Sequence, residues 1–115
     1  MDNEQLIKTL EGYERYYDRM EREQYKKGKE ESSDYAACMW CLCHKLKIRL
    51  MRDKGEDVFE ILFEYKEHYD ALVRIDDIKD SPDNKKRHQD SREACDVLEK
   101  RLRTAIKNSD KKTKA

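Results

Sequence analysis

The sequence predicts an all-α protein, a compact bundle of three to four helices with the second helix at its centre. Composition supports this class, because the 115 residues include only 3 Gly and 1 Pro, with 45% charged and 37% hydrophobic residues. Such a chain favours long helices over tight turns. Apolar residues also recur at alternating spacings of four and three, which draws one stripe along each helix. We expect one domain over residues 1–108 and a disordered basic tail over residues 109–115.

The first predicted helix begins after Asp2 or Asn3, either of which is a favourable N-cap. Its apolar stripe consists of Leu6, Leu10, Tyr13, Tyr17 and Met20. Gly28 can adopt the left-handed conformation that ends many helices. The sequence therefore predicts that this helix ends close to Gly28.

The second predicted helix contains the most apolar stretch of the chain, YAACMWCLCHKLKIRL at residues 35–50. Ser32 or Ser33 can cap its start, and Gly55 can end it after Lys54. Residues 35–43 carry no charged side chain on any side of the helix. We therefore expect this helix to be central, with the first and third helices against it.

The third predicted helix starts after Asp57, and Phe63 and Ile75 widen the apolar stripe that it presents to the core. Ser81 and Pro82 suit the N-cap and first position of a fourth helix. Residues 56–84 hold ten acids and three bases, a net charge of −7, whereas residues 85–115 hold eleven bases and five acids, a net charge of +6. If these two helices pair in antiparallel fashion, their opposite charges would partly cancel each other's electrostatic field.

Three cysteines and one histidine lie within residues 38–44, and Cys38 with Cys41 forms the Cys-x-x-Cys pair of many zinc sites. The next candidate ligand pair follows on the same helix, and His44 lies about 9 Å along the axis from Cys38, too far to share one ion. We therefore favour free thiols in a core helix, with zinc at Cys38 and Cys41 as the minority interpretation. The sequence shows no apolar leader and no apolar run of membrane length, so we expect a cytoplasmic protein. We also expect no cofactor.

Two acidic pairs give a first alternative function. Glu64 with Glu67 and, after 25 residues, Glu93 with Asp96 form the pattern Glu-x-x-Glu and Glu-x-x-Asp. This spacing, together with the segment EACDVL, resembles the magnesium-binding motif of the MazG-like nucleotide pyrophosphatases. The resemblance covers only the third and fourth helices, and it implies a small all-α enzyme whose carboxylates hold magnesium ions on a nucleoside triphosphate. Lys and Cys stand between the acids where that family usually has a small glycine.

Basic residues of the fourth helix give a second alternative. Lys85, Lys86, Arg87 and Arg92, with the tail, could bind nucleic acid through charge alone. The formal net charge of the chain is 0, and no nucleic-acid-binding motif aligns with it. We do not favour this alternative.

Side chains off the stripe of the first helix predict a protein-binding surface. Tyr16 and Tyr25 lie there together with Arg15, Arg19 and Arg22. Tyr and Arg are the residues most enriched at interaction hot spots. The favoured interpretation is a small non-enzymatic protein-binding module, an adaptor or an inhibitor of the kind that phages and other mobile elements carry. A homodimer stays open as well, because a slim core would gain buried apolar area from it.

Overall fold

The computed structural model describes residues 1–53 and 55–114, with side chains described for all of these except 112–114. Within this part of the chain it contains no strand and four helices, namely α1 (Asn3–Lys26), α2 (Glu30–Arg52), α3 (Val58–Lys79) and α4 (Pro82–Lys114). The predicted all-α fold is therefore confirmed. No helix of the described residues is both long and apolar enough to cross a membrane.

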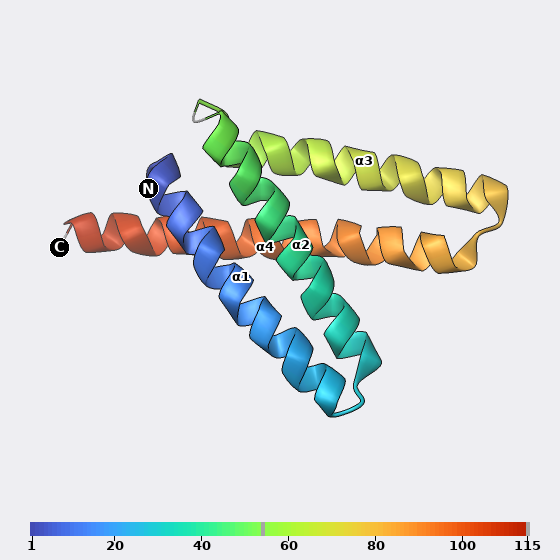
Figure 1. Ribbon diagram of the computed structural model, residues 1–115. Coiled ribbons are helices and arrows are strands. Elements are labelled where there is room, and N and C mark those ends of the chain that lie inside the picture. Colours follow the sequence, from blue (N-terminus) through green and yellow to red (C-terminus); the bar gives the residue numbers. More distant parts are fainter. Residues whose placement is uncertain (54, 115) are drawn as a thin grey trace.

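The helices pair as two antiparallel hairpins that cross each other (Figure 1). α1 lies along α2, and α3 lies along α4. At the crossing α2 packs against α4, and it also touches α3, so the second helix is central as predicted. α3, however, packs mainly against α4 rather than α2, because a short connection folds these two helices onto each other.

Both ends of α1 follow the prediction. The Asp2 carboxylate accepts a hydrogen bond from the Gln5 N–H at 2.8 Å, and the Gln5 side chain accepts one from the Asp2 N–H at 2.9 Å. This reciprocal capping box satisfies N–H groups that a helix start leaves unpaired. After Lys26 the chain turns at Gly28, whose φ of 72° is a left-handed conformation that glycine adopts without strain.

The start of α2 differs from the prediction. α2 begins at Glu30, ahead of Ser32 and Ser33, so neither serine is its cap. Lys29 precedes the helix without a side-chain cap, and the acidic first turn interacts favourably with the helix dipole instead. Ser33 is buried, and its hydroxyl donates to the backbone carbonyl of Glu21 on α1 at 3.3 Å. Packing against α1 therefore decides the role of this serine.

The connections on either side of α3 are short. α2 ends at Arg52, and Lys54, where the sequence places its end, lies outside the described residues. The Asp57 carboxylate caps α3 by accepting from the Phe59 N–H at 2.7 Å. After α3 the chain reverses at Asp80, which takes a left-handed φ of 52°.

α4 begins at Pro82 as predicted and stays helical to Lys114. No glycine or proline follows Pro82 to end it. The tail predicted for residues 109–115 is therefore helical as far as the structure describes it, and the last residue lies outside the described part. The assignment of residues 1–108 to one domain stays a prediction.

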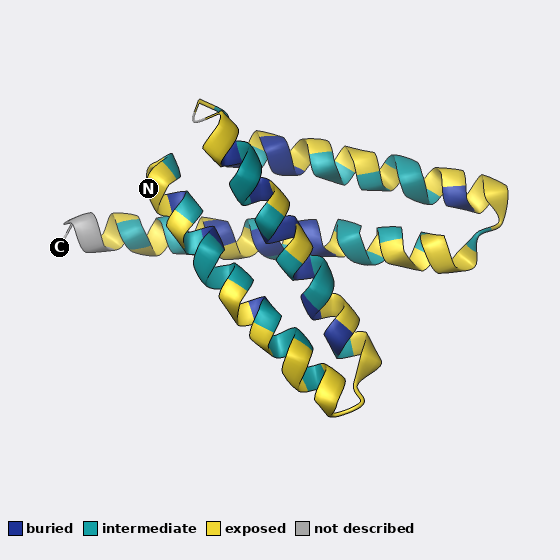
Figure 2. Cartoon of the chain, viewed as in Figure 1, coloured by how far each residue is buried: buried dark blue, intermediate teal, exposed yellow. Residues whose placement is uncertain are grey.

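The core lies where the hairpins cross, and all four helices contribute buried side chains to it (Figure 2). The largest fully buried side chains are Leu10, Tyr17, Met39, Cys43, Leu46, Leu50, Ile61, Leu62, Cys95, Leu98 and Leu102. The stretch YAACMWCLCHKLKIRL is thus a core helix, as predicted, but one edge of it is open, because Tyr35 and Cys41 are exposed.

Candidate protein-interaction surface

The side chains predicted to bind a partner are all exposed on α1, and they are Arg15, Tyr16, Arg19, Arg22 and Tyr25. Tyr16 is 51% exposed and Tyr25 is 75% exposed. At about 100° per residue, Tyr25 points to the opposite side of α1 from Tyr16. The arginines lie between these two tyrosines on the outward side of the helix. The five residues therefore form an arc around α1 with one tyrosine at each edge.

Arg101 of α4 connects one edge of this arc to the rest of the protein. Its guanidinium carbon lies over the rings of Tyr13, Tyr16 and Tyr17, at 5.7, 5.4 and 5.3 Å from their centroids. Cations within about 6 Å of a ring centroid are attracted to the face of the ring. The rings of Tyr16 and Tyr17 also meet edge to face at 5.0 Å. We call these four residues the Arg101 cluster.

Burial favours the neutral form of two tyrosines of the cluster, Tyr13 and Tyr17. Burial raises the pKa of Tyr17 well above its ordinary value of 10.0, although the positive charge of Arg101 acts in the opposite direction. Burial likewise raises the pKa of Tyr13. The guanidinium of Arg101 therefore lies over two rings whose hydroxyl groups burial keeps protonated. The sequence gives no sign that Arg101 contacts the tyrosines of α1, because only the approach of α4 to α1 brings them together.

A groove of about 540 Å³ lies beside the Arg101 cluster, between α1 and α4. It is lined by Tyr13, Val97, Lys100, Arg101, Thr104, Ala105 and Asn108. Lys100 and Arg101 are exposed, and no carboxylate of the described residues forms an ion pair with either. The lining therefore combines apolar, neutral polar and basic side chains, without an acidic one.

The carboxylates of the pyrophosphatase-like pattern do not converge, and they are Glu64, Glu67, Glu93 and Asp96. Glu64 turns toward α2, where its Oε2 atom lies 2.7 Å from Arg49. Glu67 and Glu93 are exposed and line separate hollows. Among the described residues, no three or more His, Cys, Asp or Glu side chains are placed to hold a metal ion together.

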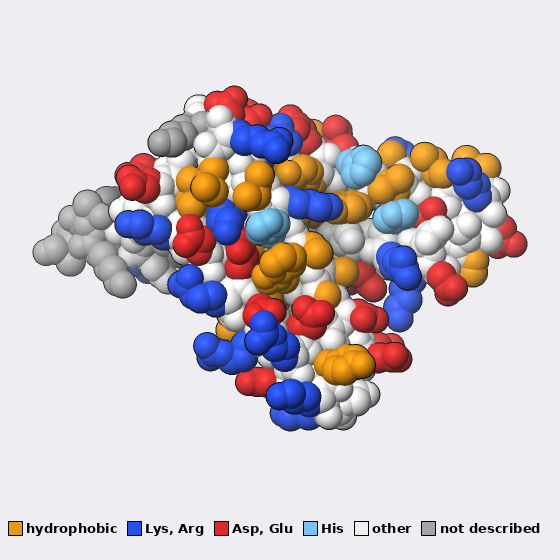
Figure 3. Space-filling model, viewed as in Figure 1, with side chains coloured by type: hydrophobic (Ala, Val, Ile, Leu, Met, Phe, Trp, Pro, Cys, Tyr) orange, Lys and Arg blue, Asp and Glu red, His pale blue; other side chains and the backbone are white. Residues whose placement is uncertain are grey.

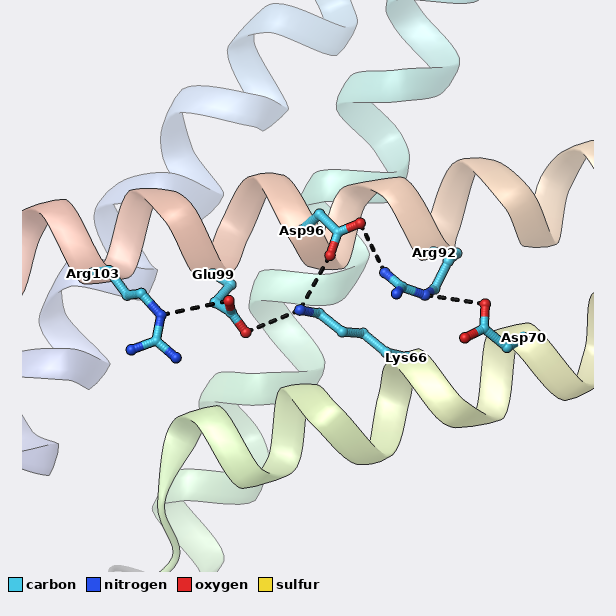
Figure 4. A network of polar contacts seen from close by, with 6 residues as sticks. All are labelled: Lys66, Asp70, Arg92, Asp96, Glu99 and Arg103. Atoms are coloured by element: carbon cyan, nitrogen blue, oxygen red, sulfur yellow. Dashed lines mark hydrogen bonds and ion pairs between the residues drawn. The ribbon is translucent and has the colours of Figure 1, made fainter.

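Asp96 belongs to a polar network that joins α3 to α4 (Figure 4). Lys66 Nζ lies 2.9 Å from Glu99 and 3.1 Å from Asp96. Arg92 lies 2.8 Å from Asp96 and 3.1 Å from Asp70. Partial burial alone would raise the pKa of Asp96, but its hydrogen bonds with Arg92 and Lys66 outweigh burial and lower it. The hydrogen bond from Lys66 lowers the pKa of Glu99. In this structure the network therefore engages these carboxylates with the protein's own cations.

The residues of the nucleic-acid alternative lie in the first half of α4, and they are Lys85, Lys86, Arg87 and Arg92. Three of them contact carboxylates, because Lys85 lies 2.6 Å from Asp77, Lys86 lies 3.9 Å from Glu31, and Arg92 pairs as described above. Acidic and basic side chains are interspersed over the face seen in Figure 3. The pairing of α3 with α4 thus places opposite charges side by side.

Cys38 and Cys41 line a shallow hollow of about 270 Å³ together with Tyr69 and Ser91. All four cysteines of the chain are free thiols. Burial raises the pKa of Cys38, and it raises the pKa of the fully buried Cys43 to about 12. Cys43 thus points into the core, and the described residues bring no third Cys or His ligand to Cys38 and Cys41.

Part of the predicted stripe of α3 faces outward. Phe63 and Ile75, which the spacing assigns to the core-facing side, are 58% and 44% exposed, and Ile78 is 85% exposed. The stripe was predicted too wide, because α4 covers only one side of α3. These apolar side chains stand among acidic ones such as Glu60 and Glu67, which are also exposed.

The fold and these surfaces define a small all-α helical bundle. Comparison of the chain with protein-family models, with curated proteins and with solved structures finds no match.

Proposed function

We propose that this chain is a small non-enzymatic protein-binding module, an adaptor or an inhibitor, that engages its partner through the α1 surface around Tyr16. The observation that carries the proposal is the Arg101 cluster, in which the half-exposed Tyr16 meets the buried ring of Tyr17 edge to face and the exposed Arg101 lies over both rings. Tyr and Arg dominate binding hot spots, since each combines a large contact area with polar donors. A cytoplasmic location accords with the four free thiols and forms part of the proposal.

Rigidity of the surface supports the proposal. Tyr17 is 1% exposed, and its ring meets Tyr16 edge to face and Tyr35 at 6.3 Å in the same geometry. Arg101 then covers Tyr16 from α4. A side chain that is already fixed loses little conformational freedom on binding, so more of its contact energy is available for affinity.

The alternatives have less support. A magnesium-dependent pyrophosphatase would use Glu64 and Asp96, yet both form ion pairs with basic side chains of this chain. A nucleic-acid binder would use Lys85 and Arg92, which are likewise engaged with carboxylates. We therefore place the partner surface on α1 and its contact with α4.

The test is recovery of the tagged full-length chain from its own cells, followed by native mass spectrometry of the assembly. We expect a heavier complex that contains a second polypeptide. Tyr16→Ala combined with Arg19→Ala should abolish capture of that polypeptide while the helical circular dichroism signal stays unchanged. Phe63→Ala with Arg74→Ala is the matched control, because it removes an exposed aromatic ring and an exposed arginine from α3.

Capture that survives the Tyr16 and Arg19 variant but not the control variant would move the binding surface to α3. A bare monomer or dimer from cells would refute the proposal. Magnesium-dependent release of pyrophosphate from nucleotides, lost in Glu64→Gln or Glu67→Gln, would establish the enzyme instead.

A further inference from the structure

We infer that the groove between α1 and α4 binds an acidic amphipathic helix of the partner protein. This inference rests on the proposed function and names the chemistry of the partner. Four observations support it: the shape of the groove, its apolar floor, the unpaired charge on its wall and the fixed position of Arg101.

The groove has the length and lining that a helix needs. Its α4 wall runs from Val97 to Asn108, which corresponds to about three helical turns. Val97, Ala105 and the ring of Tyr13 give it an apolar floor. Small residues such as Ala105 let a second helix approach closely, and an amphipathic helix in a groove anchors apolar side chains at every third or fourth position.

The charge of the groove selects an acidic occupant. Where α3 and α4 face each other, Lys66 of α3 and Arg92 of α4 form ion pairs with carboxylates of the network in Figure 4. Lys100 and Arg101, which line the groove, have no such partner among the described residues. A carboxylate entering the groove would therefore meet two cations that the fold has left uncompensated.

Arg101 is pre-arranged for such a carboxylate. Its guanidinium is held against three tyrosine rings, at 5.3 to 5.7 Å from their centroids. A stacked guanidinium keeps its in-plane N–H donors available, and these match the two oxygens of a carboxylate. Because the side chain is already positioned, binding loses little of its rotamer freedom.

The same features favour a peptide over a nucleic acid. A phosphate backbone needs a row of free cations, yet three of the four candidates that precede the groove on α4, Lys85, Lys86 and Arg92, contact carboxylates. Only Arg87 of the four is exposed without an ion pair to a described residue, and one cation is not a row. The groove itself offers apolar surface at Val97 and Ala105, which phosphates do not use. The two unpaired cations of the groove, Lys100 and Arg101, thus lie beside apolar surface.

In the experiment, a peptide probe is titrated into the full-length ¹⁵N-labelled chain, and the amide chemical shifts of the chain are measured by NMR at each step. The probe is a synthetic amphipathic peptide of about 18 residues with Leu at every third or fourth position and Glu elsewhere. We expect saturable shifts at Val97, Thr104 and Ala105. Arg101→Gln should weaken binding by about tenfold, and Lys100→Gln should weaken it in the same direction by a smaller factor.

Arg103→Gln is the matched control. Arg103 is exposed on the same helix, but it contacts Glu99 and covers the ring of Phe59 on the α3 side. This variant should bind the acidic peptide with the affinity of the unmodified chain. Thermal unfolding of each variant checks that the fold is intact, and Lys100→Gln keeps the test informative if Arg101→Gln unfolds.

Three outcomes would overturn the inference. The first is that the acidic peptide at millimolar concentration leaves the amide chemical shifts of the groove residues unchanged. The second is stronger binding in the groove by the matching Lys-for-Glu peptide or by single-stranded DNA. The third is a shift of the groove amides with protein concentration alone, which would assign the groove to a second copy of this chain. In each case cellular capture that depends on Tyr16 would still support the proposed function, so the two failures are distinguishable.

Discussion

The carboxylate of Asp76, near the end of α3, pairs with the Nδ1 atom of His88 in α4. Asp76 is only 6% exposed, and a carboxylate removed from water is costly unless it has a hydrogen-bonded partner. The backbone carbonyl of Asp76 also accepts the N–H of Ser81 at 3.0 Å, in the turn between the two helices. His88 is therefore the side-chain partner that holds this buried carboxylate at the tip of the hairpin.

We expect His88→Ala to lower the free energy of unfolding by about 1–3 kcal/mol, because it leaves a buried acceptor without its partner. The measurement is urea unfolding followed by circular dichroism at neutral pH. His68→Ala is the control, since His68 is exposed on the same hairpin and should change stability by less than about 0.5 kcal/mol. Equal losses in the two variants would mean that the Asp76 pairing does not stabilise the fold.

The network around Lys66 predicts a loss of stability in acid. Folding lowers the pKa of Asp96 and Glu99 below their ordinary values of 3.8 and 4.5. The unfolded chain therefore binds protons more readily than the folded one. The stabilisation is fully present above these ordinary values, and it is lost as the pH falls through the lower pKa values of the folded state.

Thermal unfolding between about pH 6 and pH 2.5 measures this effect. Lys66→Met keeps much of the side-chain volume and removes the cation that both carboxylates contact. Its melting temperature should fall less steeply below pH 4.5 than that of the unmodified chain. Lys8→Met, at an exposed lysine of α1, should keep the original slope. Parallel slopes for the unmodified chain and Lys66→Met would contradict the prediction.

Local signals in the sequence were sufficient for most helix boundaries. The cap at Asp2, the turn at Gly28 and the start at Pro82 each depend on neighbours within about four residues, so the sequence alone predicts them. Ser33 was wrongly predicted as a helix cap, because its hydroxyl donates to the backbone carbonyl of Glu21 on the neighbouring helix α1 and does not cap its own helix. Local rules fail where a tertiary contact competes.

The candidate surfaces depend on contacts that no spacing encodes. Tyr16 was predictable as an exposed side chain, but the cation that covers it, Arg101, comes from the other hairpin. Conversely, Asp96 fits a magnesium motif by spacing, yet its nearest partners are Lys66 and Arg92. In a chain with 26 acidic and 26 basic residues, the spacing of charged residues alone does not predict a binding site, because the pairing of the helices decides which charges are neutralised.

Two glycines of the first hairpin should respond to alanine with opposite signs. Gly28 has a φ of 72° and open space around an added Cβ atom, so Gly28→Ala should destabilise by about 1 kcal/mol through backbone strain alone. Gly12 lies inside α1, where an added Cβ would meet Arg15 at an ordinary 4.0 Å. Gly12→Ala should therefore stabilise by about 0.5–1 kcal/mol. Urea unfolding measures both, and effects of the same sign would contradict the assigned backbone conformations.

The cysteines of α2 should differ in reactivity according to the side of the helix that each occupies. With iodoacetamide at about pH 8, we expect Cys41, which is exposed, to react first and Cys38 to follow more slowly, because burial raises its pKa. Cys43 and Cys95 are buried with pKa values raised to about 12 and about 11, so they should react only when the chain unfolds. Peptide mass spectrometry of the labelled protein measures this order. Labelling of Cys43 as fast as Cys41 would refute the packing of α2, whereas protection of Cys41 that a chelator releases would support the zinc interpretation.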